Sequence, residues 1–272
     1  MNRRSAVRVS VCMRVHNAGR FVGAAIESVL AQSFKDFELL VIDDGSTDDS
    51  PAVITAFTDR RIQYVQLDRC GLARATNIAL QRARGDYIAI MDADDLAYED
   101  RLAKQVAVLD QEMRTVLVGS WIDVIDEHGQ SRGERRYPTG DGAIRKALLR
   151  ANPFAHPTLM YRRTAARDAG GYRDVLPTVE DYDFNLRLLR NGEGRNVPHK
   201  LLAYRTHAHS VKATKTKQQL RETIRLRGIA HRTYGYRFDT TARSIDTAQR
   251  CMMALPSSSI RWLFERVSYQ KA

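Results

Sequence analysis

The sequence predicts an α/β protein in which a largely parallel sheet is covered by helices on both faces. Along residues 7–109, short apolar stretches of strand length alternate with segments of helical periodicity. The strand-like stretches are apolar on both sides, which is typical of parallel strands buried on two faces. Strands alternating with helices of about 10–15 residues indicate such a sheet.

Four strand–helix pairs make up this first part of the chain. The expected strands cover 7–15, 37–42, 62–67 and 86–91, and the expected helices cover 21–30, 47–57, 72–84 and 99–109. The first strand is broken by Asn17-Ala18-Gly19. Thr47, Asp48 and Asp49 carry side-chain oxygens that can cap the second helix.

Beyond Val116 the pattern is less regular. We expect strands at 116–119 and 201–205, an extended segment at 152–161 interrupted by two prolines, and a helix at 180–190. Residues 132–142 are polar and rich in turn-forming residues, which is typical of a loop. From Lys212 onward we expect helices and loops.

The net charge of +11 belongs to one part of the chain. Among 272 residues there are 43 Lys and Arg and 32 Asp and Glu, and residues 195–272 hold 16 of the basic and 4 of the acidic ones. The 43% of hydrophobic residues exclude a disordered chain. Because no nucleic-acid reader motif accompanies the basic region, we expect no nucleic-acid partner.

The last residues have the pattern of a short basic amphipathic helix. Ile260, Leu263, Phe264 and Val267 recur at helical spacing, with Arg261, Arg266 and Lys271 beside them. Such a helix either packs on the body with a solvated basic face or lies on an anionic membrane surface.

Neither a membrane span nor a secretory signal is expected. No apolar window approaches the length of about 20 residues that a span requires, and no long apolar stretch follows the first arginines. The three cysteines, Cys12, Cys70 and Cys251, do not form the pattern of a disulfide framework. We therefore expect a cytoplasmic protein, with peripheral contact at the inner face of the cytoplasmic membrane as an open option.

Polar residues follow three of the expected strands at the points where the strands end. The three runs are Arg14-Val15-His16-Asn17, Asp43-Asp44-Gly45-Ser46 and Asp92-Ala93-Asp94-Asp95. In open α/β sheets, ligands bind beyond the carboxyl ends of the strands. The sequence therefore predicts a binding site where these runs converge.

The third run is suited to a metal ion. Three acids in four residues repel one another unless a cation lies between them. Asp92 and Asp94 are two residues apart, so on a turn both can face one hard cation such as Mg²⁺ or Mn²⁺. The alternative is that Asp95 caps a helix and the turn is simply solvated.

These runs, in this order, resemble the family 2 glycosyltransferases of the GT-A fold, of the bacterial polysaccharide type. The similarity covers residues 7–210 and includes the three strand ends, together with the later motifs His156-Pro157, Gly171-Tyr172, Glu180-Asp181-Tyr182-Asp183 and Tyr204-Arg205-Thr206-His207. The resemblance implies a Rossmann-like mixed sheet flanked by helices. It also implies a domain at 1–210, with a nucleotide-binding half at about 7–119 and an acceptor half at about 120–210, followed by a basic helical extension at 211–272.

The resemblance implies roles for the residues that would bind the donor, a UDP-sugar. Val15, Asn17, Asp44, Arg74, Asp92 and Ala93 would bind the nucleotide. Asp44 would accept a hydrogen bond from uracil. Asp94 would be the main ligand of Mg²⁺ or Mn²⁺ and would bridge the cation to the diphosphate, with Asp92 near the ribose and the metal.

The resemblance also implies an inverting transfer to a hydroxyl of a glycan or lipid-linked saccharide. Asp181 would be the general base, and direct attack by a hydroxyl needs only one such base. His156, Glu180, Arg205 and His207 would contact substrate, the last two approaching the diphosphate. From the residues alone, Glu180-Asp181 is also explained as negative charge at a helix N-terminus.

This sequence departs from the family pattern at two places. Arg14 and His16 stand where the first strand usually has proline and tyrosine, and Thr76 stands where an arginine is frequent, with Arg74 nearby.

The alternative function is a nucleotide-binding or scaffold protein that keeps the fold without turnover. A dehalogenase-like phosphatase would need its aspartate pair near the N-terminus, and a zinc site at His207 would need further Cys or His ligands.

Overall fold

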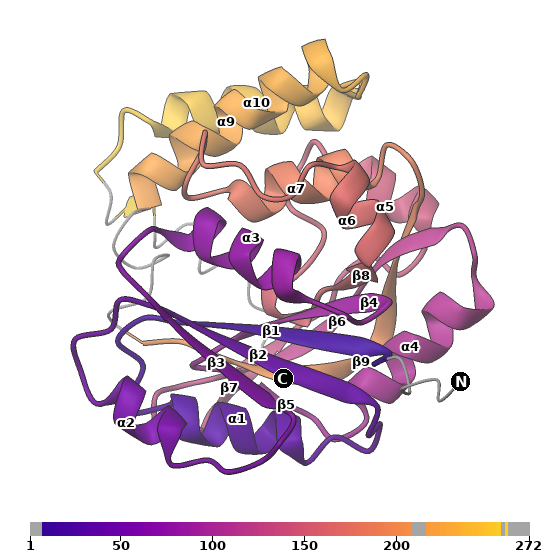
Figure 1. Ribbon diagram of the computed structural model, residues 1–272. Helices are drawn as coiled ribbons and strands as arrows, with labels where there is room; N and C mark the ends of the chain where they lie inside the picture. Colours follow the sequence, from indigo (N-terminus) through magenta and orange to yellow (C-terminus); the bar gives the residue numbers. More distant parts are fainter. Residues whose placement is uncertain (1–6, 208–215, 257–258, 261–272) are drawn as a thin grey trace.

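The computed structural model describes residues 7–207, 216–256 and 259–260. Its centre is a nine-stranded mixed sheet with the order β3-β2-β1-β4-β8-β6-β9-β5, and β7 pairs with β6 outside this path. Figure 1 shows helices on both faces of the sheet. The α/β class with a mixed sheet flanked by helices is therefore confirmed.

The elements have the following bounds. The strands are β1 (Val9–Val15), β2 (Phe37–Asp44), β3 (Ile62–Leu67), β4 (Tyr87–Asp92), β5 (Leu96–Ala97), β6 (Thr115–Ile125), β7 (Ser131–Arg135), β8 (Met160–Arg162) and β9 (Glu193–Arg205). The helices are α1 (Val22–Leu30), α2 (Ser50–Thr55), α3 (Leu72–Arg82), α4 (Arg101–Gln111), α5 (Asp141–Ala147), α6 (Arg163–Asp168), α7 (Glu180–Leu188), α9 (Thr216–Thr233), α10 (Thr240–Met252) and the 3₁₀ turn η1 (His156–Thr158).

Two hydrophobic cores lie on opposite faces of the sheet because side chains alternate along each strand. In β1, Val11 and Met13 pack with α1, α2 and α4, whereas Cys12 packs with α3 and α7 on the other face. The first face is the lower one in Figure 1 and the second the upper one. Both faces are covered, which explains why the strands are apolar on both sides.

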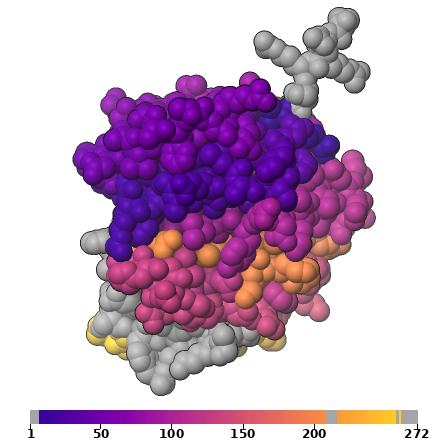
Figure 2. Space-filling model, turned by 90° about the horizontal axis from the view of Figure 1, so that it is seen from below, coloured from indigo at the N-terminus to yellow at the C-terminus, as the bar shows by residue number. Residues whose placement is uncertain are grey.

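The first half of the chain follows the expected pattern. β1, β2, β3 and β4 are parallel neighbours, and each of the four expected strand–helix pairs is present with ends shifted by a few residues. Seen from below, the indigo and purple strand–helix units lie together, and orange residues of β9 reach the surface beside pink segments (Figure 2).

The second half differs from several expectations. Residues 132–142 were expected to form a loop, but Ser131–Arg135 is an edge strand, β7, and Asp141 begins α5. The strand expected at 116–119 is the longer β6, and the one expected at 201–205 is the last part of β9. The segment 152–161 is not extended throughout, because η1 includes Pro157, which suits the start of a helical turn.

The described part of the C-terminal extension is a pair of helices packed on the body. Leu226 and Ala230 of α9 and Ala242 of α10 are buried in the core that contains α3 and α7, and Figure 1 shows the pair above α7. Among the helices that the structure describes, none has the length and apolarity needed to cross a bilayer. The amphipathic pattern at 260–267 lies outside the described residues except for Ile260.

Candidate functional site

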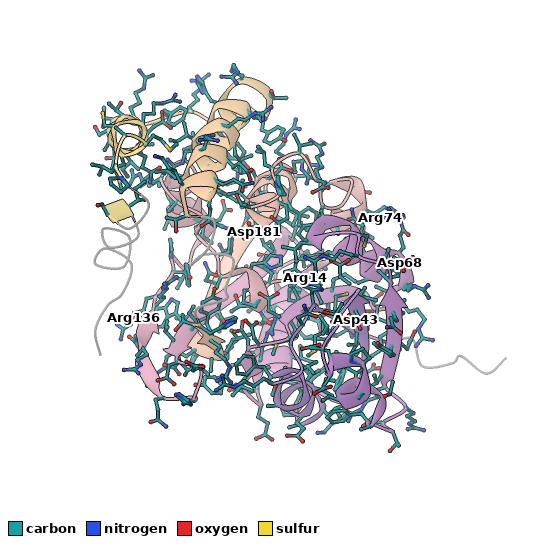
Figure 3. All side chains as sticks on the ribbon, turned by 90° about the vertical axis from the view of Figure 1, so that its left-hand side faces the viewer. Arg14, Asp43, Asp68, Arg74, Arg136 and Asp181 are labelled. Atoms are coloured by element: carbon teal, nitrogen blue, oxygen red, sulfur yellow. The ribbon has the colours of Figure 1, made fainter. Side chains whose placement is uncertain are left out.

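The carboxyl ends of three neighbouring strands meet at one edge of the sheet. In the register of the sheet, Val15 of β1 lies opposite Asp43 of β2, and Arg14 of β1 lies opposite Asp92 of β4. Figure 3 looks at the side of the molecule where this edge opens, with Asp43, Arg14 and Asp181 labelled. The convergence expected from the sequence is therefore present.

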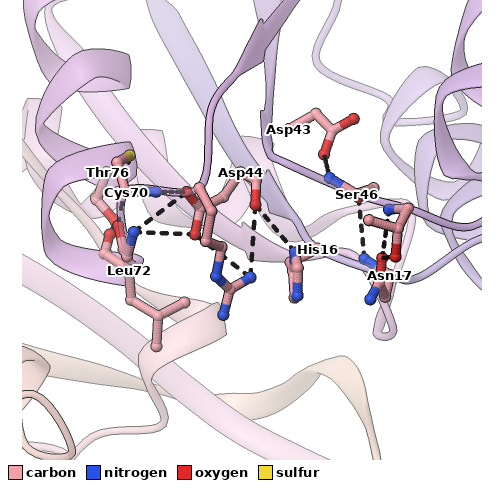
Figure 4. A network of polar contacts seen from close by, with 11 residues as sticks. His16, Asn17, Asp43, Asp44, Ser46, Cys70, Leu72 and Thr76 are labelled. Carbon is pink, nitrogen blue, oxygen red and sulfur yellow. Dashed lines mark hydrogen bonds and ion pairs between the residues drawn. The ribbon is translucent and has the colours of Figure 1, made fainter.

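Asp44 organises the turn that begins α3. Its Oδ1 accepts hydrogen bonds from the backbone N–H of Cys70 at 2.6 Å and of Gly71 at 3.2 Å. Nδ1 of His16 lies 2.9 Å from the carbonyl oxygen of Asp44, as Figure 4 shows. The Asp44 carboxylate is almost fully buried and holds the turn before α3, while its backbone carbonyl faces His16 after β1.

Asn17 connects the ends of β1 and β2. It has a positive φ of 52°, a conformation that asparagine tolerates better than most residues. Its Oδ1 accepts from the N–H of Thr47 at 2.8 Å, and its own N–H donates to Oγ of Ser46 at 3.0 Å (Figure 4). Gly45 has φ of 67°, and a Cβ there would lie 2.8 Å from the backbone nitrogen of Arg69, so the loop needs glycine.

The acids that follow β4 point in different directions. Asp95 is buried and accepts the backbone N–H of Arg205 at 2.7 Å. Asp94 is partly exposed, and its Oδ2 lies 3.0 Å from Nε2 of His207. Asp92 is also partly exposed and faces Arg14. Asp95 therefore fixes the end of β9, whereas Asp92 and Asp94 remain accessible at the site.

Arg205 is directed into the protein. Its Nε donates to the carbonyl oxygen of Asp94 at 2.8 Å, and its Nη1 donates to that of Asp126 at 3.0 Å. Its guanidinium also lies 4.8 Å from the centroid of the Phe21 ring. In this conformation Arg205 holds the acid-bearing turn, and His207 is the β9-end residue that touches an accessible acid.

The hydrogen bond to Asp94 raises the pKa of His207 above its ordinary value, although burial acts in the opposite direction. The ring of His207 also lies 5.7 Å from the ring of Phe21. The protonated form of His207 is therefore stabilised beside Asp94. In that form the ring is a positively charged hydrogen-bond donor next to the proposed metal ligand.

Asp92 and Asp94 fit a hard divalent cation that takes its other ligands from a substrate. Among the described residues, no group of three or more His, Cys, Asp or Glu side chains is arranged to hold a metal ion by itself. Two accessible carboxylates are nevertheless the usual protein share of a Mg²⁺ or Mn²⁺ site completed by phosphates and water. The donor set therefore fits Mg²⁺ or Mn²⁺ bound together with a diphosphate.

Arg14 is a buried cation between two acidic side chains. Its Nη2 donates to Oδ1 of Asp92 at 2.9 Å, and its Nη1 lies 3.9 Å from Oε1 of Glu180. Burial disfavours its charge, but Asp92 and Glu180 outweigh this effect and raise the pKa of Arg14. Arg14 thus joins the acids after β4 to the first turn of α7.

The first turn of α7 carries two acids in different environments. Burial, with a further contribution from Asp181, raises the pKa of Glu180 to about 8. Asp181 is partly exposed, and its Oδ2 accepts a hydrogen bond from Nδ2 of Asn152 at 3.1 Å. Burial therefore favours the protonated form of Glu180, while Asn152 orients the partly exposed carboxylate of Asp181.

The other expected site residues lie around this centre. Nδ1 of His156 lies 3.5 Å from Nη2 of Arg14, and its Nε2 lies 3.2 Å from the hydroxyl of Tyr172. Val15 and Ala93 are buried. Arg74 is exposed on α3. The structure thus groups His156, Arg14 and Glu180, and it leaves Arg74 at the rim.

Sequence reasoning missed two residues of the site and one beneath it. Arg14 was noted only as part of the run that ends the first strand and as a departure from the family, without a role, and Asn152 only as part of an extended segment. Arg101 is buried behind β4, where Nη2 donates to the carbonyl oxygen of Ile90 at 2.6 Å, and burial lowers its pKa to about 10. A charged residue inside an otherwise apolar strand, as at Arg14, was the one available signal.

Comparison with known proteins agrees with this geometry. The family model described as glycosyl transferase family 2 matches residues 10–170. The chain is 37% identical over 216 residues to the putative glycosyltransferase EpsE of Bacillus subtilis, covering 76% of both chains. It is 30% identical over 229 residues to WfaP of Escherichia coli, named as a UDP-Glc:α-D-GlcNAc-diphosphoundecaprenol β-1,3-glucosyltransferase, covering 81% of this chain and 86% of WfaP.

Solved structures show the same fold at low sequence identity. TarS of S. aureus in complex with UDP-GlcNAc gives a TM-score of 0.69 at 17% identity, covering 96% of this chain and 74% of TarS. The mannosyltransferase PcManGT of Pyrobaculum calidifontis in complex with GDP-Man and Mn²⁺ gives 0.61 at 18% identity, covering 96% and 80%. Taken with the family match and the arrangement of the strand ends, these similarities show that the chain is a glycosyltransferase of family 2 with the GT-A fold.

Proposed function

We propose that the chain transfers a sugar from a UDP-sugar to a hydroxyl of a glycan or lipid-linked saccharide, with inversion at the anomeric carbon. One observation carries the proposal: Arg14 connects the acids that would hold the diphosphate to the helix turn that bears Asp181. The anomeric carbon of the donor would then lie between the acids that hold the diphosphate, Asp92 and Asp94, and the carboxylate of Asp181.

The nucleotide would bind along the ends of β1 and β2. Asp44 is held rigidly by two backbone N–H groups, so its carboxylate is preorganised to accept the uracil N–H. Asn17 fixes the adjoining loop, and Arg74 at the start of α3 offers a positive charge at the rim. Support for UDP comes from WfaP, named for UDP-Glc, and from TarS with its bound UDP-GlcNAc.

The diphosphate would lie at Asp92 and Asp94. A bound Mg²⁺ or Mn²⁺ supplies Lewis-acid neutralisation of the negative charge that develops on the leaving UDP, as the Mn²⁺ with GDP-Man in PcManGT suggests. His207, whose protonated form is favoured by the hydrogen bond to Asp94, would donate to a phosphate oxygen. Arg205 would keep the Asp94 turn in place through its bond to the Asp94 carbonyl oxygen.

Asp181 would accept the proton of the acceptor hydroxyl as the new bond forms. Its carboxylate is oriented by Asn152, and burial raises the pKa of Glu180, which would limit the negative charge facing the donor. A single base acting on a hydroxyl that attacks the anomeric carbon directly gives inversion. His156 and Glu180 would line the same space and contact the sugar.

We further propose that the extension brings the enzyme to an anionic membrane that carries a lipid-linked acceptor. Arg221, Arg225 and Arg232 are exposed along α9 at spacings that place them on one face. Each surface cation contributes about 1 kcal/mol of attraction to an anionic leaflet. Sedimentation with anionic and zwitterionic vesicles tests this, and equal binding of the wild type and the variant with all three arginines changed to glutamine would contradict it.

Turnover with a panel of donors tests the main proposal. UDP-glucose, UDP-galactose and UDP-GlcNAc are incubated with Mn²⁺, and UDP release is measured. Asp181→Asn should lower kcat by about 10²–10⁴-fold and leave UDP binding unchanged, whereas Asp174→Asn, at an exposed position in the preceding segment, should keep activity. Binding of UDP without turnover of any donor would instead support a non-catalytic nucleotide-binding protein.

A further inference from the structure

Helix α9 holds the segment that leads into the proposed base. Oε2 of Glu222 accepts hydrogen bonds from both the backbone N–H of Thr178, at 2.9 Å, and its hydroxyl, at 2.6 Å. Nε2 of Gln219 donates to the carbonyl oxygen of Thr178 at 3.4 Å. Thr178 is buried and stands three residues before Asp181, so two side chains of α9, three residues apart, hold the backbone just before the proposed base.

The residues after α9 hold the body of α7. The hydroxyl of Tyr234 donates to Oδ1 of Asp183 at 2.8 Å, and that of Tyr236 donates to the carbonyl oxygen of Leu186, also at 2.8 Å. Nε of Arg187 completes the Asp183 contact from within α7. The helix that begins with Glu180 is therefore fastened to the extension both before its first turn and along its length.

The start of α7 depends on this external support. The residue before the helix is Val179, which has no side chain that can cap, and no side-chain cap bond is made there. Helix N-termini usually gain such a bond from Ser, Thr, Asp or Asn. Here the carboxylate of Glu222 binds the N–H of the residue before Val179, a charge-assisted contact close to the positive end of the helix.

The other end of the same segment is also fixed, but by the nucleotide-binding half. Nδ2 of Asn77 in α3 donates to the carbonyl oxygen of Tyr172, and Oδ1 of Asn77 accepts the N–H of Tyr172, both at 2.8 Å. The segment 173–177 thus runs between an anchor on α3 and an anchor on α9. The distance from the nucleotide to the base is set by both anchors.

We propose that the C-terminal extension is part of the active site, with Glu222 as a positioning residue that sets the place of Asp181 through Thr178. The inference rests on the proposed role of Asp181. It gives the extension a task in the transfer reaction itself, in addition to any contact with a membrane.

A double-mutant cycle with Glu222→Ala and Thr178→Val tests the proposal. Each variant should lower kcat by about 10–100-fold, because a displacement of about 1 Å at a reacting group can cost 10²-fold. The affinity for UDP with Mn²⁺ should not change, since Asp44 and Asp94 lie in the other half. The double variant should be no slower than Glu222→Ala, because Thr178→Val removes only the hydroxyl bond, one of the two bonds to Thr178 that Glu222→Ala removes.

Two further variants separate positioning from stability. Glu222→Gln keeps an acceptor oxygen and should restore part of kcat, while Thr247→Ala, at an exposed position of α10, should match the wild type. If Glu222→Ala and Thr178→Val lower Tm but leave kcat per folded molecule unchanged, the inference is overturned. Full activity of Asp181→Asn would instead refute the proposed base, which distinguishes the two failures.

Discussion

Nη2 of Arg14 donates a hydrogen bond to Oδ1 of Asp92 across 2.9 Å, between two strands that lie side by side in the sheet. The contact is nearly buried on the Arg14 side, and the same guanidinium approaches Glu180. The end of β1 therefore carries the cation that joins the acid at the end of β4 to the first turn of α7.

Replacing Arg14 should be costly to folding. Arg14→Met removes the hydrogen bond to the partly exposed carboxylate of Asp92 and the contact with Glu180, and a hydrogen bond to a charged group contributes about 1.5–3 kcal/mol. Urea denaturation measures the loss. Arg69→Met is the matched control, because Arg69 is largely exposed and lies 3.6 Å from Asp44, a geometry worth at most about 1 kcal/mol. Equal losses in the two variants would refute the structural role of Arg14.

The raised pKa of Glu180 predicts a pH dependence of stability. Between its ordinary pKa and about 8, folded Glu180 keeps a proton that the unfolded chain releases. The folded state therefore binds more protons in this window, so its contribution to stability is lost as pH rises through the folded pKa. As the pH rises from about 6 to about 9, the Tm of Glu180→Gln should fall less than the Tm of the wild type.

Thermal unfolding at both pH values measures this difference. Glu99→Gln changes an exposed carboxylate and should keep the wild-type dependence on pH. A wild-type protein whose Tm does not fall relative to Glu180→Gln would show that Glu180 is ionised throughout.

Asp44→Asn should affect both the turn before α3 and the nucleotide. The amide has one acceptor oxygen in place of two and carries an NH₂ group toward backbone donors, so the bonds to Cys70 and Gly71 are weakened. Leaving a buried donor without its partner costs about 1–3 kcal/mol. Denaturation and UDP titration measure the two effects, and Asp68→Asn, at an exposed position nearby, should show neither.

The first half of the fold could be predicted because its local signals agree with its tertiary structure. Each of β1, β2 and β4 is a largely apolar segment, and polar residues mark its end. β7 escaped prediction because Ser131–Arg135 is a polar edge strand that pairs with β6 alone and needs no apolar run. The strand predicted at 201–205 is shorter than β9 because exposed residues at 198–200 interrupt the apolar pattern of β9, at the point where its register with β6 shifts.

The candidate site was predictable only where it is local in sequence. The spacing of Asp92 and Asp94 at a strand end predicts that they belong to a site, and the position of Asp44 at a strand end does the same. The contacts of Arg14 with Glu180, of Asn152 with Asp181 and of Glu222 with Thr178 join residues far apart in the chain. No periodicity or spacing reports such contacts, because packing of whole elements creates them.

The most direct test of the account is calorimetric titration of UDP into the protein with Mn²⁺, with EDTA in place of Mn²⁺, and with Asp94→Asn in Mn²⁺. The account predicts binding of UDP by the wild type in Mn²⁺, and an affinity at least about tenfold weaker, equivalent to about 1.4 kcal/mol, both in EDTA and in Asp94→Asn. Absence of UDP binding by the wild type in Mn²⁺, or equal affinity in all three titrations, would contradict it.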